Sequence, residues 1–133
     1  MTQPLTQGAH HIGFTVSKLE ATAAFFIDAL GWREVRRDPA YPSIFVSDGV
    51  TMLSLWAARE PAAAFDKNHH VGLHHAAFKV ESEAALNAVY EKIKTAPGVV
   101  MEFAPELLRQ GPAKHMMCYE PSGIRIEFIW PGI

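Results

Sequence analysis

The segments HIGFTV at residues 11–16 and HAAFKV at residues 75–80 decide the fold, because nearly the same pattern begins at positions 11 and 75, 64 residues apart. In both segments every second residue is apolar, which is the period of a half-buried β-strand. A repeat about half the chain long predicts a duplicated unit. A histidine opens each copy.

A helical pattern follows each of these strands. Ser17-Lys18-Leu19-Glu20 has the form of a capping box, and Gly31 is a natural end for the first helix. In the second copy Ser82 is the predicted cap, and Pro97-Gly98 ends the helical run. Each half of the chain is therefore predicted to begin β-α.

Three further extended segments follow each helix. They cover residues 33–37, 43–46 and 51–56 in the first half and residues 99–103, 115–119 and 124–130 in the second. The predicted unit is βαβββ, used twice in tandem, which is an α+β fold. We expect a single domain over residues 1–133, with a first module at about 8–57, a connector at 58–72 and a second module at about 73–131.

The composition is that of an ordinary globular protein. Hydrophobic residues make up 49% of the chain, charged residues 20%, and the formal net charge is −2. Basic blocks, long apolar runs and a signal-peptide pattern are not seen, which disfavours nucleic acid, membrane and export. The single cysteine, Cys118, excludes an internal disulfide and suits the reducing cytosol, so we expect a cytoplasmic protein.

The last predicted strand carries a carboxylate in its middle. Ile124, Ile126 and Phe128 alternate on one face, which places Arg125 and Glu127 on the other. Burying Glu127 is costly unless it is paired or binds a metal. Arg125 is one candidate partner, and a metal held together with the two strand histidines is the other.

A metal bound by Glu127 and the two strand histidines has a chemical rationale. Two imidazoles and one carboxylate, from His11, His75 and Glu127, suit a divalent transition metal that keeps open positions for a substrate. Structural zinc normally has four protein ligands, often cysteines, and this chain has one cysteine. The set is therefore interpreted as a catalytic site.

These patterns resemble a known family. The HIGFTV strand, a helix containing Ala24-Phe25-Phe26 and ending Leu30-Gly31-Trp32, and the closing EPSGIRIE at residues 120–127 are similar to the vicinal oxygen chelate superfamily. That group includes glyoxalase I, extradiol dioxygenases, methylmalonyl-CoA epimerase, fosfomycin-resistance enzymes and bleomycin-resistance proteins. The resemblance implies two βαβββ modules curled into a cupped, half-open barrel with a metal on its inner face.

The resemblance also implies roles for particular residues. Family ligands come from the first and last strands of each module, which maps onto His11, His75 and Glu127 and places Ser54 at the fourth ligand position. Serine is a poor ligand, so Ser54 is expected to line the pocket or hold a water. Predicted catalytic residues are Glu127, His115 and Tyr119, and predicted substrate-binding residues are Ser54, Trp56 and Arg125. For Arg125 the alternative is an ion pair with Glu102 or Glu81.

Several reactions are compatible with this set. Extradiol dioxygenases use Fe²⁺ or Mn²⁺ on two histidines and one glutamate, with a tyrosine ahead of the glutamate and an acid–base histidine. Here Met117 stands at the tyrosine position, flanked by His115 and Tyr119. Glyoxalase-type lyases and isomerases use Zn²⁺, Ni²⁺ or Co²⁺ but need the ligand that Ser54 replaces. A fosfomycin-type thiol transferase is third, and a non-enzymatic bleomycin-resistance type binder is the alternative, its cup lined by Trp32, Tyr41, Phe45 and Trp56.

The remaining histidines have simpler interpretations. His10 and His74 are predicted to be solvated or packed at a strand start, and His69 and His70 to lie on the surface of the connector. Members of the superfamily often pair, and in some the first-module histidine comes from the partner. We therefore expect a homodimer acting on a small molecule, with His11 and His75 meeting either within one chain or across the dimer.

Overall fold

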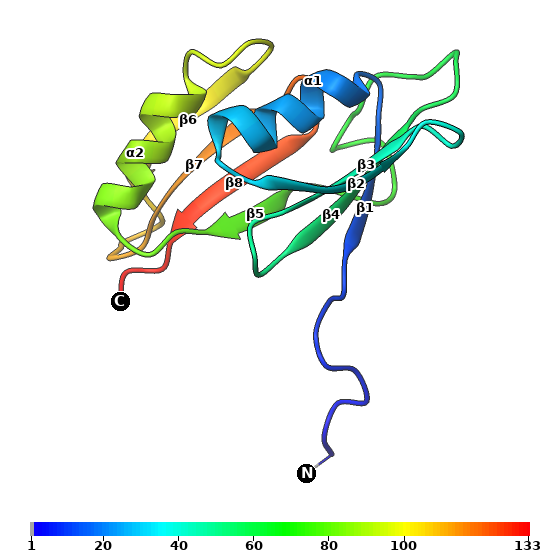
Figure 1. The fold of residues 1–133 in the computed structure, drawn as a ribbon. Helices are drawn as coiled ribbons and strands as arrows, with labels where there is room; N and C mark the ends of the chain where they lie inside the picture. The colour runs from blue at the N-terminus through cyan, green and yellow to red at the C-terminus, as the bar shows by residue number, and fades with distance from the viewer. Residues whose placement is uncertain (1) are drawn as a thin grey trace.

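Two four-stranded sheets build the molecule in a computed structural model that describes residues 2–133 (Figure 1). The elements are β1 (Ile12–Val16), α1 (Leu19–Ala24), the π-helical turn η1 (Phe25–Ala29), β2 (Arg33–Asp38), β3 (Ser43–Ser47), β4 (Met52–Ala57), β5 (Ala76–Lys79), α2 (Glu83–Ile93), β6 (Val100–Leu107), β7 (Lys114–Tyr119) and β8 (Arg125–Trp130). The predicted tandem βαβββ fold is confirmed. Each predicted strand is present to within a few residues at its ends.

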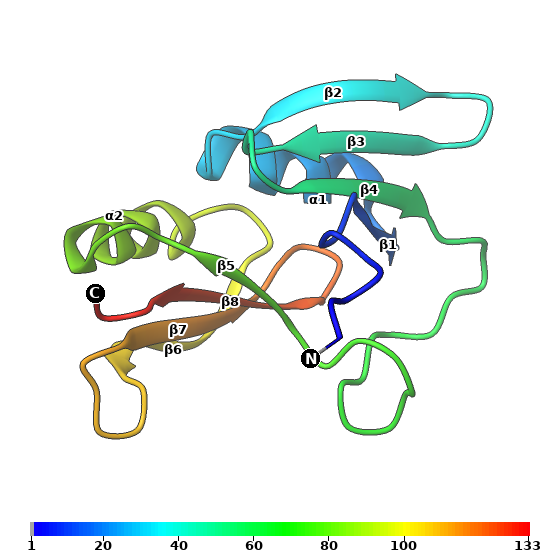
Figure 2. The same cartoon turned by 90° about the horizontal axis from the view of Figure 1, so that it is seen from below.

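The two sheets have equivalent topologies. The strand orders are β1-β4-β3-β2 and β5-β8-β7-β6, and the first strand of each module pairs in parallel with the last. The sheets are cupped and do not close into a barrel, as Figure 2 shows. In each sheet β1 or β5 is an edge strand, so the two histidine-bearing segments lie at sheet edges.

The helix boundaries correct one expectation. Ser82 caps α2 as predicted, since its hydroxyl accepts the Ala85 N–H at 3.0 Å. Ser17 does not cap α1, because the helix begins after Lys18 and no side chain accepts a bond there. The Lys18 N–H instead donates to Ser122 Oγ in the second module, at 3.0 Å. A contact between modules thus takes the place of the expected capping box.

One hydrophobic core joins the modules. Phe26 of η1 and Trp32 both pack edge-to-face on Phe78 of β5, with ring centroids 6.1 and 5.3 Å apart. Phe78 in turn contacts Phe128 of β8, at 6.2 Å. The face of each sheet that carries its helix is therefore the face turned toward the other module, and the opposite, helix-free face of each sheet points outward. We call these helix-free faces the open faces.

A buried carboxylate makes a second contact between the two modules. Glu120, 1% exposed in the turn between β7 and β8, accepts a hydrogen bond from Thr22 Oγ1 of α1 at 2.6 Å. It also accepts the backbone N–H groups of Ser122 at 2.9 Å and Ile124 at 3.2 Å. Burial raises the pKa of the Glu120 carboxyl, and the hydrogen bond from Thr22 partly opposes that rise. The turn that precedes β8 is thereby tied to the first module.

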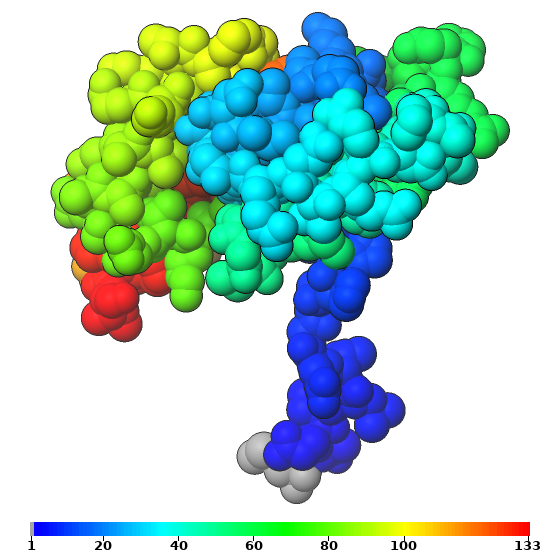
Figure 3. Space-filling model, in the orientation of Figure 1, coloured from blue at the N-terminus to red at the C-terminus, as the bar shows by residue number. Residues whose placement is uncertain are grey.

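From residue 2 onward, the described segment ahead of β1 extends away from the body of the molecule (Figure 3). Within residues 2–133, none of the helices has the length and hydrophobicity that crossing a bilayer would require.

Candidate functional site

Glu127 is the centre of the candidate site on the second sheet. It lies in the middle of β8, is 7% exposed, and faces Met117 of β7 across the ladder. Ile126 and Phe128, its neighbours, point into the core under α2. The alternation predicted from the sequence therefore holds, and Glu127 lies on the open face.

Two imidazoles contact the Glu127 carboxylate. His75 Nε2 lies 3.2 Å from Oε1, and His115 Nδ1 lies 2.6 Å from Oε2. His75 directly precedes β5. His115 is on β7 opposite Ile129, which lies on the same face of β8 as Glu127. Phe103 of β6 packs on the His115 ring, with centroids 5.0 Å apart. Three of the predicted site residues are thus brought together.

Arg125 does not pair with Glu127. Its guanidinium donates to both carboxylate oxygens of Glu102 on β6, Nε to Oε1 at 2.8 Å and Nη2 to Oε2 at 2.9 Å. These bonds hold the pKa of Glu102 below its usual range, with smaller contributions from Tyr119 and Lys67. Tyr119, opposite Arg125 in the ladder, therefore lies beside this ion pair, and the two imidazoles are the side chains that contact the Glu127 carboxylate.

The open face of the first sheet is aromatic. Trp56 packs edge-to-face with Tyr41 and with Phe45, at centroid distances of 5.2 and 5.8 Å. The indole Nε1–H donates to Ser54 Oγ at 2.9 Å, and Ser54 is 1% exposed. Ser54, placed at the fourth ligand position by resemblance, thus orients Trp56. Trp32, named as a possible lining residue of the cup, is instead in the core.

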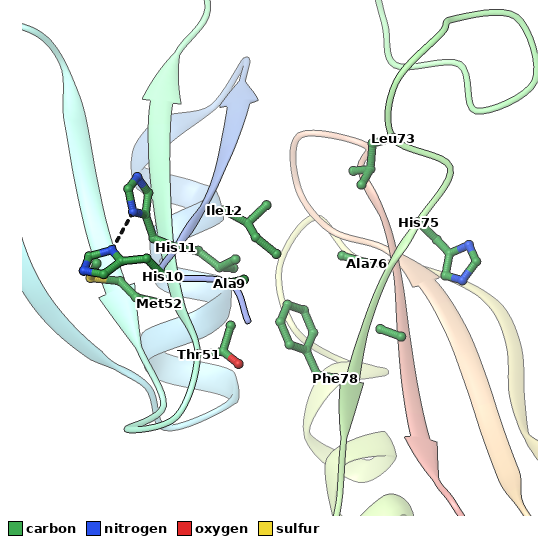
Figure 4. A pocket seen from close by; sticks show the side chains of 12 residues that line it. Ala9, His10, His11, Ile12, Thr51, Met52, Leu73, His75, Ala76 and Phe78 are labelled. Atoms are coloured by element: carbon green, nitrogen blue, oxygen red, sulfur yellow. Dashed lines mark hydrogen bonds between the residues drawn. The ribbon is translucent and has the colours of Figure 1, made fainter. Parts of the chain in front are cut away.

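His11 and His75 lie on opposite sides of the chain. A cleft of about 350 Å³ separates β1 from β5, and Ile12 and Phe78 point into it while the rings of His11 and His75 point away (Figure 4). The His11 ring lies near Phe45 on the first open face, at 6.4 Å between centroids. Over residues 2–133, no group of three or more His, Cys, Asp or Glu side chains is arranged to hold a metal ion. One chain therefore does not assemble the predicted triad by itself.

The His75–Glu127 pair nevertheless fits a metal. Bonds of about 2.0–2.2 Å from a metal to nitrogen or oxygen put neighbouring donor atoms roughly 3 Å apart. The 3.2 Å between His75 Nε2 and Glu127 Oε1 matches this spacing. Imidazole and carboxylate are also the donor types that such ions prefer.

Known proteins resemble this chain in sequence or in fold. YqjT of Bacillus subtilis (strain 168) is 29% identical over 137 residues, which cover 92% of this chain and 98% of that protein. A glyoxylase/bleomycin resistance protein/dioxygenase domain from Frankia sp. EAN1pec has a TM-score of 0.80 at 22% identity, covering 95% of this chain and 98% of that one. Lactoylglutathione lyase from Agrobacterium tumefaciens has a TM-score of 0.71 at 21% identity, covering 95% and 96%.

These structural similarities concern the fold alone. The family model for the Glyoxalase/Bleomycin resistance protein/Dioxygenase superfamily matches residues 8–128, nearly the whole chain. Together with the paired βαβββ modules, this match shows that the chain belongs to the glyoxalase/bleomycin resistance protein/dioxygenase superfamily.

Proposed function

We propose that this protein is a metal-dependent enzyme whose site contains His75 and Glu127 of one chain and His11 of a second copy. The observation that carries the proposal is the surroundings of Glu127: a nearly buried carboxylate contacted by two imidazoles while the adjacent Arg125 is taken by Glu102. A nearly buried carboxylate must be paired or bind a metal, and the imidazoles that contact it are of a type that binds divalent transition metals.

The need for a second copy of the chain follows from the directions in which the His11 and His75 rings point. His11 and His75 lie on open faces that point away from each other within one chain (Figure 4). Pairing the first open face of one chain with the second open face of another would bring His11 to His75 and Glu127. A twofold axis would create two such sites at once. We therefore propose a homodimer in which each site is shared.

The ligand count favours one reaction class. Ser54 is buried and its hydroxyl accepts the Trp56 N–H, so it is poorly placed to act as a fourth ligand. A set of two histidines and one carboxylate is the arrangement of non-haem Fe(II) oxygenases. When bound, the metal would supply open positions for two substrate oxygens and for dioxygen. We infer extradiol dioxygenase-like cleavage of a small aromatic diol, with Fe²⁺ or Mn²⁺ as the cofactor.

The chain's own residues fit this substrate. Tyr41, Phe45 and Trp56 offer an aromatic wall for a planar ring. His115, whose Nδ1 is engaged by Glu127, retains Nε2 for exchanging a proton with a substrate hydroxyl. Arg125 lies two residues before Glu127 on β8, beside Tyr119 of β7 and paired with Glu102 of β6, and this group would contact a polar substituent. Glyoxalase-like chemistry on Zn²⁺, Ni²⁺ or Co²⁺ is less well supported, because it needs the ligand that Ser54 replaces.

A second candidate is a non-enzymatic binder that sequesters a small molecule. The edge-to-face cluster of Tyr41, Phe45 and Trp56 favours it, since such a surface binds planar apolar groups without a metal.

Metal analysis and oxygen uptake separate the two candidates. The untagged chain, reconstituted anaerobically with Fe²⁺, is expected to bind one metal per chain and to consume dioxygen with at least one member of a catechol panel. His75→Ala and Glu127→Gln should lose both properties, whereas His69→Ala, an exposed connector histidine, should keep them. A native chain that binds no divalent metal yet binds aromatic ligands would refute the enzyme and support the binder.

A further inference from the structure

His11 and His75, which directly precede the first strand of each module, each contact the ring of the histidine before them. His10 Nδ1 lies 2.9 Å from His11 Nδ1, and His74 Nδ1 lies 2.8 Å from His75 Nδ1. The ring centroids are 5.1 Å apart in both doublets, with the planes near perpendicular at 81° and 72°. The same contact thus occurs at equivalent positions of the two modules.

The contact couples the protonation patterns of the two rings. A neutral imidazole carries one N–H, on either Nδ1 or Nε2. Because Nδ1 faces Nδ1, one ring must donate and the other must accept. If His74 donates, His75 carries its proton on Nε2; if His75 donates, its Nε2 has a free lone pair.

The rest of the site selects between these patterns. His75 Nε2 faces Glu127 Oε1 at 3.2 Å, so in the metal-free chain Nε2 carries the proton and His74 donates. A His75 that binds a metal through Nε2 must instead carry its proton on Nδ1. It can then donate to His74 Nδ1, provided that His74 has moved its own proton to Nε2.

We propose that His74 and His10 are positioning residues whose Nδ1 atoms pair with Nδ1 of His75 and His11 and hold those rings in place in both the metal-free and the metal-bound state. The inference rests on the proposed function in that it takes His75 and His11 to be metal ligands. Histidine suits the task because its Nδ1 can donate in one state and accept in the other, which a backbone carbonyl cannot do. Both states contain two ring protons per doublet, so the switch, made by exchange with water, changes no charge.

Outer partners of this kind have measurable effects. Groups that hydrogen-bond to a metal-binding imidazole set its tautomer and orientation, and their loss typically weakens metal affinity about 10–100-fold. The interpretation of His10 and His74 as merely solvated or packed residues assigns them no such effect.

Ring-nitrogen NMR of the full chain tests the proposal without relying on activity. In ¹⁵N-histidine-labelled protein, at a pH well above the ordinary imidazole pKa of about 6.5, the metal-free chain should show His74 protonated on Nδ1 and His75 on Nε2. Adding Zn²⁺ should reverse both assignments. In His74→Phe, which keeps a ring and removes both nitrogens, Glu127 should still hold the His75 proton on Nε2, but His75 Nδ1 should lose its hydrogen-bond partner and its ¹⁵N resonance should shift.

Zn²⁺ affinity, measured by competition with a chelating dye, gives the second readout. His74→Phe should weaken binding about 10–100-fold, and His74→Gln, which can both donate and accept, should recover most of the loss. His69→Phe, on an exposed residue outside the site, is the matched control and should have no effect.

The two hypotheses fail differently. A native chain that binds no Zn²⁺ refutes the proposed function, while the tautomer coupling is still decided by the metal-free spectra. A His74 whose tautomer does not change when Zn²⁺ binds, or a His75 whose ring-nitrogen spectrum is the same in His74→Phe, overturns the positioning role.

Discussion

Replacing Glu120 with alanine should destabilise the protein strongly, although this residue lies outside the candidate site. The substitution removes the acceptor of three hydrogen bonds and leaves two backbone N–H groups without a partner, the buried one of Ile124 and the part-buried one of Ser122. Each unpaired group costs about 1–3 kcal/mol, so we expect a loss of about 3–5 kcal/mol. For a chain of this length, that loss corresponds to about 10–18 °C in Tm.

Glu120→Gln is the matched control. The amide oxygen can still accept both backbone N–H groups, and its NH₂ can donate to Thr22 Oγ1, whose own proton can turn to Ser122 Oγ. We expect the free energy of unfolding to change by less than about 1 kcal/mol, as measured by urea denaturation with tryptophan fluorescence.

The pH dependence gives a further check. Because burial raises the pKa of Glu120 in the folded state above its ordinary value of 4.5, its contribution to stability is fully present below pH 4.5 and is lost as pH rises through the folded pKa. The difference in unfolding free energy between the native chain and Glu120→Gln should therefore shift in favour of the variant as pH rises. Equal stabilities of the Ala and Gln variants, or a pH-independent difference, would refute this reasoning.

Three other positions allow sharp tests. Gly13→Ala puts a Cβ 3.1 Å from Ser54 Oγ and 3.4 Å from Trp56 Nε1, so it should displace the indole, shift tryptophan emission and cost about 1–3 kcal/mol; an unchanged emission spectrum would contradict this. Ser54→Ala removes the acceptor of the Trp56 N–H and should cost about 1 kcal/mol in urea unfolding, with Ser54→Thr as the control that keeps the hydroxyl. Burial raises the pKa of the Cys118 thiol to about 12, so alkylation at pH 8 should be slow in the native chain and fast in urea; rapid native labelling would show that the thiol is accessible.

The local pattern of the sequence was sufficient to predict the fold. Alternation along residues 124–130 correctly separated Glu127 from the core, and it placed His115 and Tyr119 on one strand face, which the ladder confirms. The π-helical turn η1 was not predicted, because its apolar residues also fit an ordinary helix. Ser17 was assigned as a cap from local spacing alone, whereas its neighbour Lys18 bonds to a residue 104 positions away.

Which residues meet in the candidate site depends on contacts between residues far apart in the sequence. Such contacts leave no periodic pattern in the sequence. The positions of His11 and His75 relative to each other follow from how Phe26 and Trp32 pack on Phe78. The pairing of Arg125 with Glu102 depends on the register of β6, which is shifted between Met101 and Phe103. Such contacts are set by packing between elements, so a single sequence offers candidates for them but no choice among the candidates.

The outward direction of the two open faces has a consequence for mixtures of chains. In the proposed dimer, His11→Ala damages a site through one chain and Glu127→Gln damages it through the other. Each variant alone should be inactive, but a mixed dimer contains one site with both defects and one with neither. Random reassortment of equal amounts should therefore restore about a quarter of the native sites. Complementation between two dead variants would be the direct sign that the active unit is built from halves of different molecules.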